Sequence, residues 1–317
     1  MNKNKYKILC TCFVLLASAC GNATNTSLES STNVSNETPI QEISLIAPSG
    51  TPLLAMSTYL HENNNVKYEV ANGSDPLVAA FSSSSHDIIV APTNLGLNFY
   101  NKTSKYVLFE TIVWGNLYVV SRNPIESFLD LNEKTITLFG TNQTPDILMK
   151  TLSAENNITY EVDRVDSVEN ANALFLQNKA EYIISAEPSL SKIKEKVENL
   201  FILDLQEEWK KMTQTSSYPQ AGVFVNKEKV EDLKDELAKI KNEIITIEDD
   251  LDYTSNCALE TPLSTLGKDT IKSALPNCHI GIDENQKEAI SFYFEKLLEL
   301  NLGATFGEKL PDENFYI

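Results

Sequence analysis

The fold is indicated by the stretch EISLIAPSGTPLLAMSTYLHEN, residues 42–63. Residues 42–47 are mostly apolar and predict a buried strand. Residues 51–63 predict a helix, with Thr51 as its cap and Pro52 at its first position. A strand that passes through a short junction into a helix is the unit from which open α/β sheets are built, so the stretch predicts an α/β protein.

The same alternation of strand and helix continues along the chain. Before residue 121, further strands are predicted at 66–70, 86–91, 106–114 and 116–120, and helices at 75–84 and 93–102. After it, strands are predicted at 135–139, 158–162, 181–186 and 200–205, and helices at 144–156, 167–180 and 188–197. The chain therefore contains two α/β sets, one after the other.

The rest of the chain connects the two sets a second time. A strand at 218–226 is predicted to run back to the first set, and helices follow at 227–246, 264–274 and 284–300. We therefore expect two lobes, one of residues 41–116 plus 221–317 and one of residues 117–220. The absence of a sequence repeat of 20–50 residues excludes solenoids and propellers.

The N-terminal residues indicate export. Residues 1–7, MNKNKYK, are basic, and residues 8–17, ILCTCFVLLA, are apolar but shorter than the ~20 residues that span a bilayer. The following stretch LASACGN, 16–22, resembles a bacterial lipobox, with Ala17 where leucine is usual. We expect a lipoprotein signal peptide at 1–19, lipid on Cys20 and a flexible linker to residue 40; an ordinary signal peptide with an incidental cysteine is the alternative.

The negative charge of the chain limits the kinds of partner that it can bind. The formal net charge is −18, and residues 1–19 contain three lysines and no acid, so the mature chain is more acidic still. Nucleic acid phosphates repel such a chain, and no nucleic acid partner is expected. Because no second apolar run reaches ~18 residues, contact with the membrane is expected through the lipid anchor only.

Two cysteines remain in the part of the chain that is expected to fold. Cys257 and Cys278 are a disulfide candidate outside the membrane, and two buried free thiols are the alternative. His279 adjoins Cys278, but no second ligand pair stands nearby at zinc spacing. We therefore expect no metal and no cofactor.

Three strand–helix junctions carry small and hydroxyl residues, at 48–51, 91–94 and 140–146. In open α/β sheets, ligands bind beyond the carboxyl ends of the strands. Helix N-termini there offer free N–H groups and a partial positive charge, so the junctions are candidate ligand sites. Simple N-capping is the alternative explanation for any one of them.

Seven segments together resemble a known family: IAPSGTPLLAM (46–56), DIIVAPTNLG (87–96), TIVWGNLYVV (111–120), GTNQTPDILMK (140–150), SAEPSL (185–190), YPQAGVFVN (218–226) and KLPDENFYI (309–317). The chain resembles substrate-binding lipoproteins of ABC importers, in the branch typified by nitrate, sulfonate, taurine and thiamine-precursor binding proteins. The resemblance implies a two-lobed, periplasmic-binding-protein-like α/β fold of type II. Each lobe would be a mixed sheet flanked by helices, with the ligand cleft between the lobes.

The resemblance also implies which residues line the cleft. From the first lobe these would be Ser49, Gly50, Thr51, Thr93, Asn94 and Trp114. From the second lobe and the return crossover they would be Thr141, Asn142, Thr144, Glu187, Tyr218 and Gln220. For Trp114 the alternative is a place in the core, and for Glu187 it is a first-turn acid favoured by the helix dipole.

The absence of arginine from these junctions narrows the choice of ligand class. The two arginines, Arg122 and Arg164, both lie outside the junctions, so the usual bidentate clamp for a carboxylate or phosphate is absent there. A neutral or cationic organic molecule fits the acidic chain better. Asp75 and Glu187 would then pair with a cation, and Trp114 would stack on a ring.

The function implied is ligand capture and delivery rather than catalysis. The sequence holds no G-x-S-x-G, Walker A or H-E-x-x-H motif, and its three histidines fall in no nucleophile or metal motif. We expect a monomer on the extracytoplasmic face of a bacterial cell membrane, closing about the two crossovers and docking on a permease with a separate ATPase. An exported sensor without a transporter and, less favoured, an enzyme on the same fold are the alternatives.

Overall fold

The computed structural model describes residues 42–215 and 217–317. The predicted signal peptide, Cys20 and the linker lie outside the described residues. From residue 41 to the C-terminus the chain forms one compact unit. Within the described ranges, no helix has both the length and the apolar character to cross a membrane.

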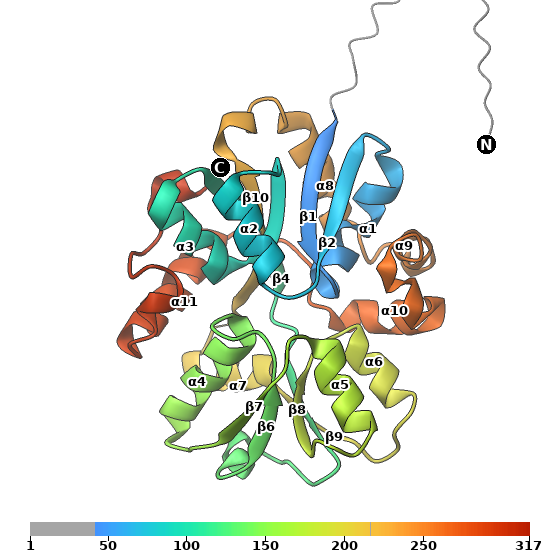
Figure 1. The fold of residues 1–317 in the computed structure, drawn as a ribbon, viewed down its shortest axis with the longest axis vertical. Helices are drawn as coiled ribbons and strands as arrows, with labels where there is room; N and C mark the ends of the chain where they lie inside the picture. Colours follow the sequence, from blue (N-terminus) through green and yellow to red (C-terminus); the bar gives the residue numbers. More distant parts are fainter. Residues whose placement is uncertain (1–41, 216) are drawn as a thin grey trace, which may run out of the picture. The chain divides into compact units, whose positions relative to one another are not determined.

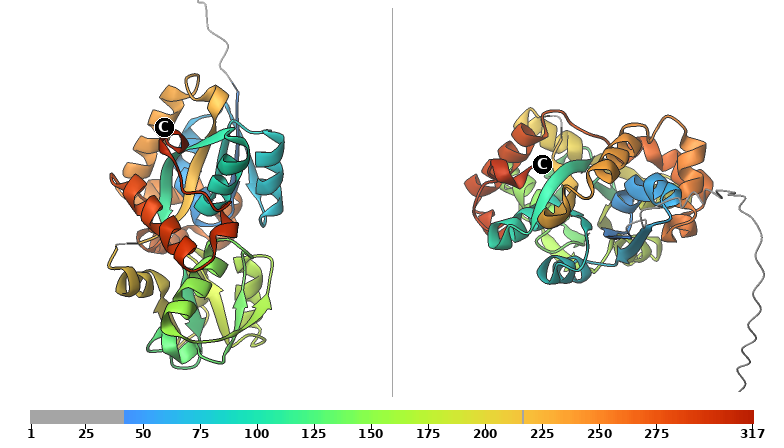
Figure 2. Two further views of the ribbon diagram at one scale, coloured as in Figure 1. Left: turned by 90° about the vertical axis from the view of Figure 1, so that its left-hand side faces the viewer. Right: turned by 90° about the horizontal axis from the view of Figure 1, so that it is seen from above.

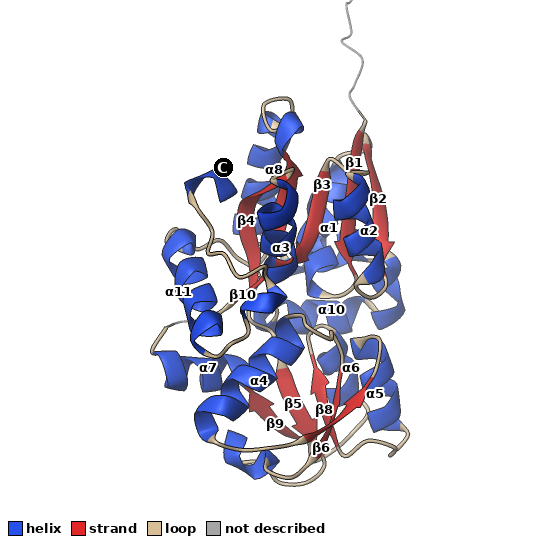
Figure 3. Cartoon of the chain, turned by 60° about the vertical axis from the view of Figure 1, so that its left-hand side comes forward, coloured by secondary structure: helices blue, strands red, loops and turns tan. Residues whose placement is uncertain are grey.

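The first sheet has five strands in the order β2-β1-β3-β10-β4 (Figures 1 and 3). Their bounds are β1 Ile43–Pro48, β2 Val66–Ala71, β3 Ile88–Pro92, β4 Tyr106–Trp114 and β10 Pro219–Asn226. β1 is parallel to β2 and β3, whereas β10 lies antiparallel between β3 and β4. The return strand thus fills a central position in the sheet.

The second sheet repeats this arrangement, with the order β7-β6-β8-β5-β9. Its strands are β5 Tyr118–Ser121, β6 Thr135–Leu138, β7 Glu161–Arg164, β8 Tyr182–Ser185 and β9 Phe201–Asp204. β6 is parallel to β7 and β8, and β5 is antiparallel to β8 and β9. Both sheets are therefore mixed, as the family resemblance implies.

Helices cover both sheets (Figure 3). The α-helices are α1 Thr51–Glu62, α2 Asp75–Ser83, α3 Thr93–Thr103, α4 Thr144–Asn156, α5 Val168–Leu176, α6 Ser189–Lys194, α7 Leu205–Thr213, α8 Lys234–Ile245, α9 Leu251–Ala258, α10 Lys268–Ala274 and α11 Gln286–Glu299. Short 3₁₀ turns are η1 Phe128–Leu131, η2 Lys227–Lys229, η3 Pro262–Leu266, η4 Leu275–Asn277, η5 Gly303–Thr305 and η6 Glu313–Phe315. After α11 the chain returns to the first sheet, where the Ile317 N–H donates to the Leu108 carbonyl at 3.1 Å (Figure 2).

The core follows the two-residue period of the strands. In β1 the side chains of Ile43, Leu45 and Ala47 belong to one buried cluster, and Ile46 belongs to another. The first cluster includes side chains of α1, α8 and α10, on one face of the first sheet. The second is larger and joins the other face, with α2, α3 and α11, to the second sheet and α4. One apolar core therefore connects both sheets.

Several predicted boundaries are wrong. The strand predicted at 116–120 begins at Tyr118, because Gly115 and Asn116 have φ angles of 98° and 89° that no strand accepts. The helix predicted at 227–246 is a 3₁₀ turn followed by α8, and α7 and α9 fall in segments where no helix is predicted. The lobe boundary predicted at 220/221 cuts β10, which begins at Pro219.

The predicted disulfide is not formed. Cys257 and Cys278 are both buried and both free, which is the alternative that the sequence left open. Cys257 lies in α9 beside Tyr253, whereas the Cys278 thiol lies beside Thr51 at the start of α1, so the two thiols face different neighbours. Burial raises the pKa of both thiols, which makes them poor nucleophiles.

Candidate functional site

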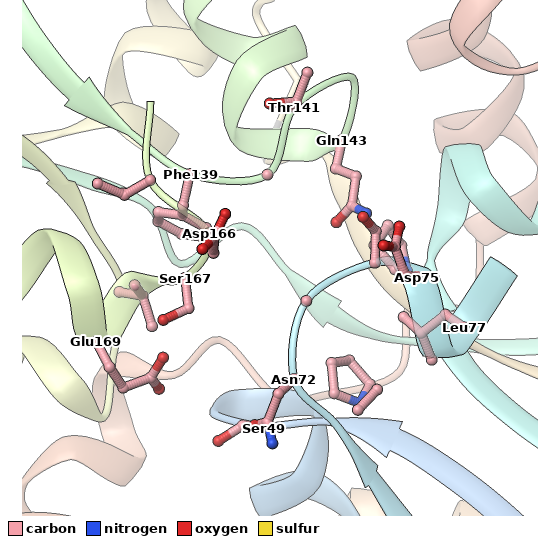
Figure 4. Close-up of a pocket in the computed structure, with 18 residues that line it drawn as sticks. Ser49, Asn72, Asp75, Leu77, Phe139, Thr141, Gln143, Asp166, Ser167 and Glu169 are labelled. Atoms are coloured by element: carbon pink, nitrogen blue, oxygen red, sulfur yellow. The ribbon is translucent and has the colours of Figure 1, made fainter. Parts of the chain in front are cut away.

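Two adjoining cavities open where the strands of the two sheets end. The larger has a volume of about 460 Å³ and the smaller about 120 Å³. Six residues line both, from the first sheet and the second: Pro48, Ser49, Pro92, Phe139, Gln143 and Val168. We call the two cavities together the cleft; Figure 4 shows the side chains around the larger one.

The junction after β1 forms part of the first-sheet wall. The chain leaves β1 at Pro48 and enters α1 at Thr51, with Gly50 as the N-cap at a φ of 89°. Glycine adopts this φ without strain, and its missing side chain leaves the wall of the smaller cavity open. Thr51, predicted as the cap, is instead the first helical residue.

A second stretch of the first-sheet wall follows β2. Asn72, Gly73 and Ser74 continue from the strand, and Asp75 begins α2. Asp75 and Gln143, which comes from the opposite wall, both line the larger cavity (Figure 4).

The second-sheet wall begins with the junction between β6 and α4. Phe139 is half-buried and lines both cavities, and Gly140 turns the chain at a φ of 69°. The buried Asp146 holds the loop, since its carboxylate accepts the Asn142 N–H at 2.9 Å. Lys150 and Arg164 donate to the same carboxylate at 2.9 and 2.8 Å.

These bonds set the charge state of Asp146. Burial by itself raises the pKa of this carboxyl group, but the hydrogen bonds from Lys150, the Asn142 N–H and Arg164 outweigh it and hold the pKa below its usual value of 3.8. Asp146 is therefore a structural carboxylate that fixes the loop from behind, rather than a group offered to the cleft.

The rest of the second-sheet wall follows β7. The backbone passes through Val165 and Asp166 to Ser167, whose hydroxyl oxygen caps α5 by accepting the Asn170 N–H. Glu169 follows in the first turn of that helix. Asp166, Ser167 and Glu169 all line the larger cavity (Figure 4).

A buried network connects the two sheets beside the smaller cavity. The Thr51 hydroxyl donates to the Glu187 carbonyl at 2.7 Å, and the Asn116 amide donates to that same carbonyl at 3.1 Å. The Glu187 N–H donates to the Asn116 side-chain oxygen at 2.8 Å, and the Asn116 amide also donates to the Thr51 hydroxyl. The first crossover is thereby bonded to both the first and second sheets.

The carboxylate of Glu187 is fully buried and paired. It accepts the Ser191 N–H at 2.8 Å and forms an ion pair with Lys194 at 2.9 Å. The α6 backbone and the lysine thus satisfy the charge inside the protein. Glu187 lines the smaller cavity, but its negative charge is already compensated.

The structure brings seven of the predicted site residues to the cleft. Six of them line the smaller cavity: Ser49, Gly50, Thr51, Thr144, Glu187 and Gln220. Thr141 lines the larger one, as Ser49 also does. The Gln220 side-chain oxygen is shielded from solvent and has no hydrogen-bond partner among the described residues.

The other five predicted residues lie outside the lining of both cavities. Thr93 and Asn94 are buried, and the Asn94 amide donates to the Asn142 and Thr305 carbonyls at 3.0 and 3.2 Å. Asn142 itself is exposed, and its carbonyl and N–H are used by these loop contacts.

The two aromatic residues of this group are held by the protein itself. Trp114 ends β4, and its indole N–H donates to the Thr111 carbonyl at 3.2 Å. Tyr218 is fully buried against Trp209 and donates its hydroxyl to Gln206 at 2.6 Å. In this structure neither ring lines the cleft.

The prediction missed several residues that do line the cleft. They are Asn72, Asn116, Phe139, Gln143, Asp166, Ser167, Glu169 and Ser189. Most follow strand ends, so the rule used for the three junctions also applies to β2 and β7. After β7 the rule would have been applied to the wrong residues, because the predicted strand ends at residue 162 whereas β7 ends at Arg164.

The lining of the cleft has one sign of charge. Among the described residues, its charged side chains are Asp75, Asp166, Glu169 and Glu187, and no lysine, arginine or histidine lines either cavity. Within the same part of the chain, no group of three or more histidine, cysteine, aspartate or glutamate side chains is arranged to hold a metal ion.

The fold resembles those of several proteins of known structure. No family model and no curated protein matches the sequence. Among solved structures, an ABC transporter protein from Parabacteroides distasonis is 22% identical with a TM-score of 0.70, covering 88% of this chain and 99% of that one.

Two further structures point in the same direction. The ligand-binding component of an ABC-type import system from Staphylococcus aureus, solved with zinc, is 12% identical with a TM-score of 0.67 (88% and 96% of the two chains). The periplasmic aliphatic sulphonate binding protein SsuA from Escherichia coli is 12% identical with a TM-score of 0.57 (84% and 89%). The predicted α/β fold of periplasmic binding proteins is thereby confirmed.

Proposed function

We propose that the protein is an extracytoplasmic solute-binding lipoprotein of an ABC importer. It captures a small organic molecule in the cleft and delivers it to a membrane permease. The observation that supports this most directly is a cleft lined from both sheets, in a fold shared with components of ABC import systems. Pockets of a few hundred Å³ between two units of a chain are typical ligand sites.

The proposed mechanism is closure of two lobes on the solute. One lobe is built on the first sheet and the other on the second, and two crossovers join them, one between β4 and β5 and one between α7 and β10. Solute contacts to both walls favour the closed form, and the difference in affinity between open and closed forms sets how far the equilibrium shifts. The closed form is the one that docks on the permease, and a separate ATPase supplies the energy.

A ligand screen tests the binding function. The full chain is mixed with a panel of small metabolites, and its melting temperature is measured for each. A true ligand at 100 times its dissociation constant stabilises the folded state by about 2.7 kcal/mol. Deletion of the gene should then lower cellular uptake of the same molecule; unchanged uptake would favour the sensor alternative.

The lipid anchor makes a separate prediction. Cys20→Ser removes the thiol that would carry diacylglycerol, and two or more acyl chains are what holds such a protein stably on a membrane. We expect the variant to appear in the soluble extracellular or periplasmic fraction, measured by cell fractionation and immunoblotting. The matched control is Cys10→Ser, within the predicted signal peptide, which should stay with the membrane; retention of Cys20→Ser would contradict the anchor.

A further inference from the structure

The charged side chains of the larger cavity come from both of its walls. Asp75 belongs to the first-sheet wall, at the start of α2, and Asp166 and Glu169 belong to the second-sheet wall, before and within α5. Figure 4 shows these carboxylates around the same cavity. A solute held there is therefore faced by negative charge from two sides.

These three carboxylates are exposed side chains of the described part of the chain. Among the described residues, none of them forms a hydrogen bond or ion pair. Their situation contrasts with Glu187 and Asp146, which lie close by and are both satisfied by lysine and by backbone N–H groups. The chain thus compensates the two buried acids, whereas the three exposed acids that line the larger cavity have no partner among the described residues.

The helix dipole explains only part of this arrangement. Asp75 and Glu169 lie in first helical turns, where a carboxylate is stabilising. Asp166 directly precedes the N-cap Ser167 and lies outside the helix, so it is not a first-turn acid. Moreover, carboxylates at the starts of α2 and α5 occupy the positive helix ends that an anionic solute would otherwise use.

The uncharged part of the lining is also suited to an organic cation. Phe139 is half-buried and lines both cavities, so its ring can contact a positive group or an apolar carbon. Pro48, Pro92 and Val168 add apolar surface. The Gln220 side-chain oxygen is shielded from solvent and lacks a hydrogen-bond partner among the described residues. An N–H or O–H donor of the solute would satisfy this acceptor.

From these observations we infer that the solute is an organic cation, with its positive group among Asp75, Asp166 and Glu169 and its carbon skeleton against Phe139. This inference rests on the proposed function and names the ligand class for the same cleft. Closure brings the carboxylates of the two walls together, and their repulsion opposes it until a cation lies between them. Anionic solutes are rejected by the same charges.

The test identifies the bound solute without assuming its structure. The purified full chain is incubated with a metabolite extract, passed through a size-exclusion column, and its retained small molecules are identified by mass spectrometry in both ion modes. We expect a retained solute with net positive charge at neutral pH. Its affinity, measured by calorimetry, should fall as salt rises toward about 0.5 M, because salt screens the charges of these exposed carboxylates.

Two triple variants with equal charge change give the matched control. Asp75→Asn/Asp166→Asn/Glu169→Gln should weaken binding of the retained cation by about tenfold or more. Glu228→Gln/Glu231→Gln/Asp232→Asn removes three exposed carboxylates that line neither cavity and should bind as the wild type does. Circular dichroism and melting temperature confirm that both variants are folded.

Each outcome decides between the proposals. A retained neutral or anionic solute overturns the cation inference and leaves the binding function standing. A retained cation that binds equally well to the cleft variant also overturns the inference, because the three carboxylates then play no part. If wild-type protein retains no solute of any charge, the proposed function fails and the inference fails with it.

Discussion

Asn116 shows how much a single residue contributes at the first crossover. It is fully buried, has a φ of 89°, and bonds to Thr51 of the first sheet's α1 and to Glu187 beyond the second sheet's β8. Asparagine tolerates this φ better than most residues, and its amide both donates and accepts. One side chain therefore fulfils a backbone requirement and a hydrogen-bonding requirement together.

Substitution at this residue separates the two requirements. Asn116→Gly removes the hydrogen bonds but keeps the φ relaxed, and it should lower the free energy of unfolding by about 2–4 kcal/mol. Asn116→Ala loses the same bonds and adds about 1 kcal/mol of backbone strain, so it should be the less stable of the two. Chemical denaturation measures both; equal stability of the two variants would contradict the strain argument.

Asp146 gives the protein a pH dependence at the acid end. Because the pKa of the folded Asp146 lies below its usual 3.8, the ionised group stabilises the folded state above that pH. The contribution is lost as the pH falls through the lowered value. We expect Asp146→Asn to lower the free energy of unfolding by about 1–3 kcal/mol at pH 7 and by much less at acid pH, once the pH has fallen through the lowered pKa and the native carboxyl has lost its charge.

Denaturant titrations at several pH values from 7 downward measure this difference. The matched control is Asp163→Asn, since Asp163 is an exposed carboxylate on β7. It should change stability little at any pH. A deficit of Asp146→Asn that stays constant over the whole acid range in which the protein remains folded would show that its cause is lost shape rather than lost charge.

At the scale of the elements, much of the fold could be predicted and much of the cleft could not. Apolar strands that alternate with helices fix the fold class, because the central strands of such a sheet, such as β1, β3 and β8, are buried on both faces. Which strand-end residues face a ligand depends instead on packing between distant segments. Asn94, for example, is covered by the Thr305 carbonyl, 211 residues away.

The aromatic residues illustrate the same limit. Tyr218 is predicted to line the cleft, yet Trp209 of α7 packs on it, and α7 falls where no helix is predicted. Phe139 carries no such local signal in the sequence, but it follows β6 directly and reaches both cavities. An unpredicted helix can therefore remove one residue from the cleft while the arrangement of the sheets exposes another.

The contact between α3 and β10 makes a prediction about one helix. A Cβ on Gly96 would lie 1.9 Å from the Phe224 ring, so the helix and strand approach as closely as they do only because this side chain is missing. Gly96→Ala should destabilise the protein by about 1–3 kcal/mol or more through overpacking. The measurement is the free energy of unfolding.

Two companion variants make this prediction specific. Gly281→Ala meets no atom within 4 Å and should change stability little. Phe224→Leu introduced with Gly96→Ala should recover part of the loss, because the smaller side chain relieves the contact. If the double variant is no more stable than Gly96→Ala alone, the ring contact is not the cause.

For the whole molecule, the shared core predicts cooperative unfolding. The largest cluster of buried apolar side chains includes members from both sheets, such as Leu108 of β4 and Val119 of β5. Neither sheet can open without exposing part of that cluster. We therefore expect the two parts to unfold in a single transition.

The two tryptophans allow this to be measured from two places. Trp114 ends β4 of the first sheet, and Trp209 lies in α7 after the last strand of the second. Trp209→Phe and Trp114→Phe each leave one reporter, and fluorescence during urea unfolding should give the same m-value, with midpoints that differ only by each substitution's own cost. A biphasic curve by circular dichroism for the wild type would contradict a common core.

The position of β10 has a consequence for how the protein is made. Residues 219–226 pair with β3 and β4, strands that emerge from the ribosome more than a hundred residues earlier. Until they arrive, the first sheet lacks a central strand, and its nascent segments have no stable structure to adopt. Long-range pairing of this kind slows folding. For the export that we propose, this delay is favourable, because a chain that has not yet folded can pass through a narrow translocation channel and complete its fold on the far side.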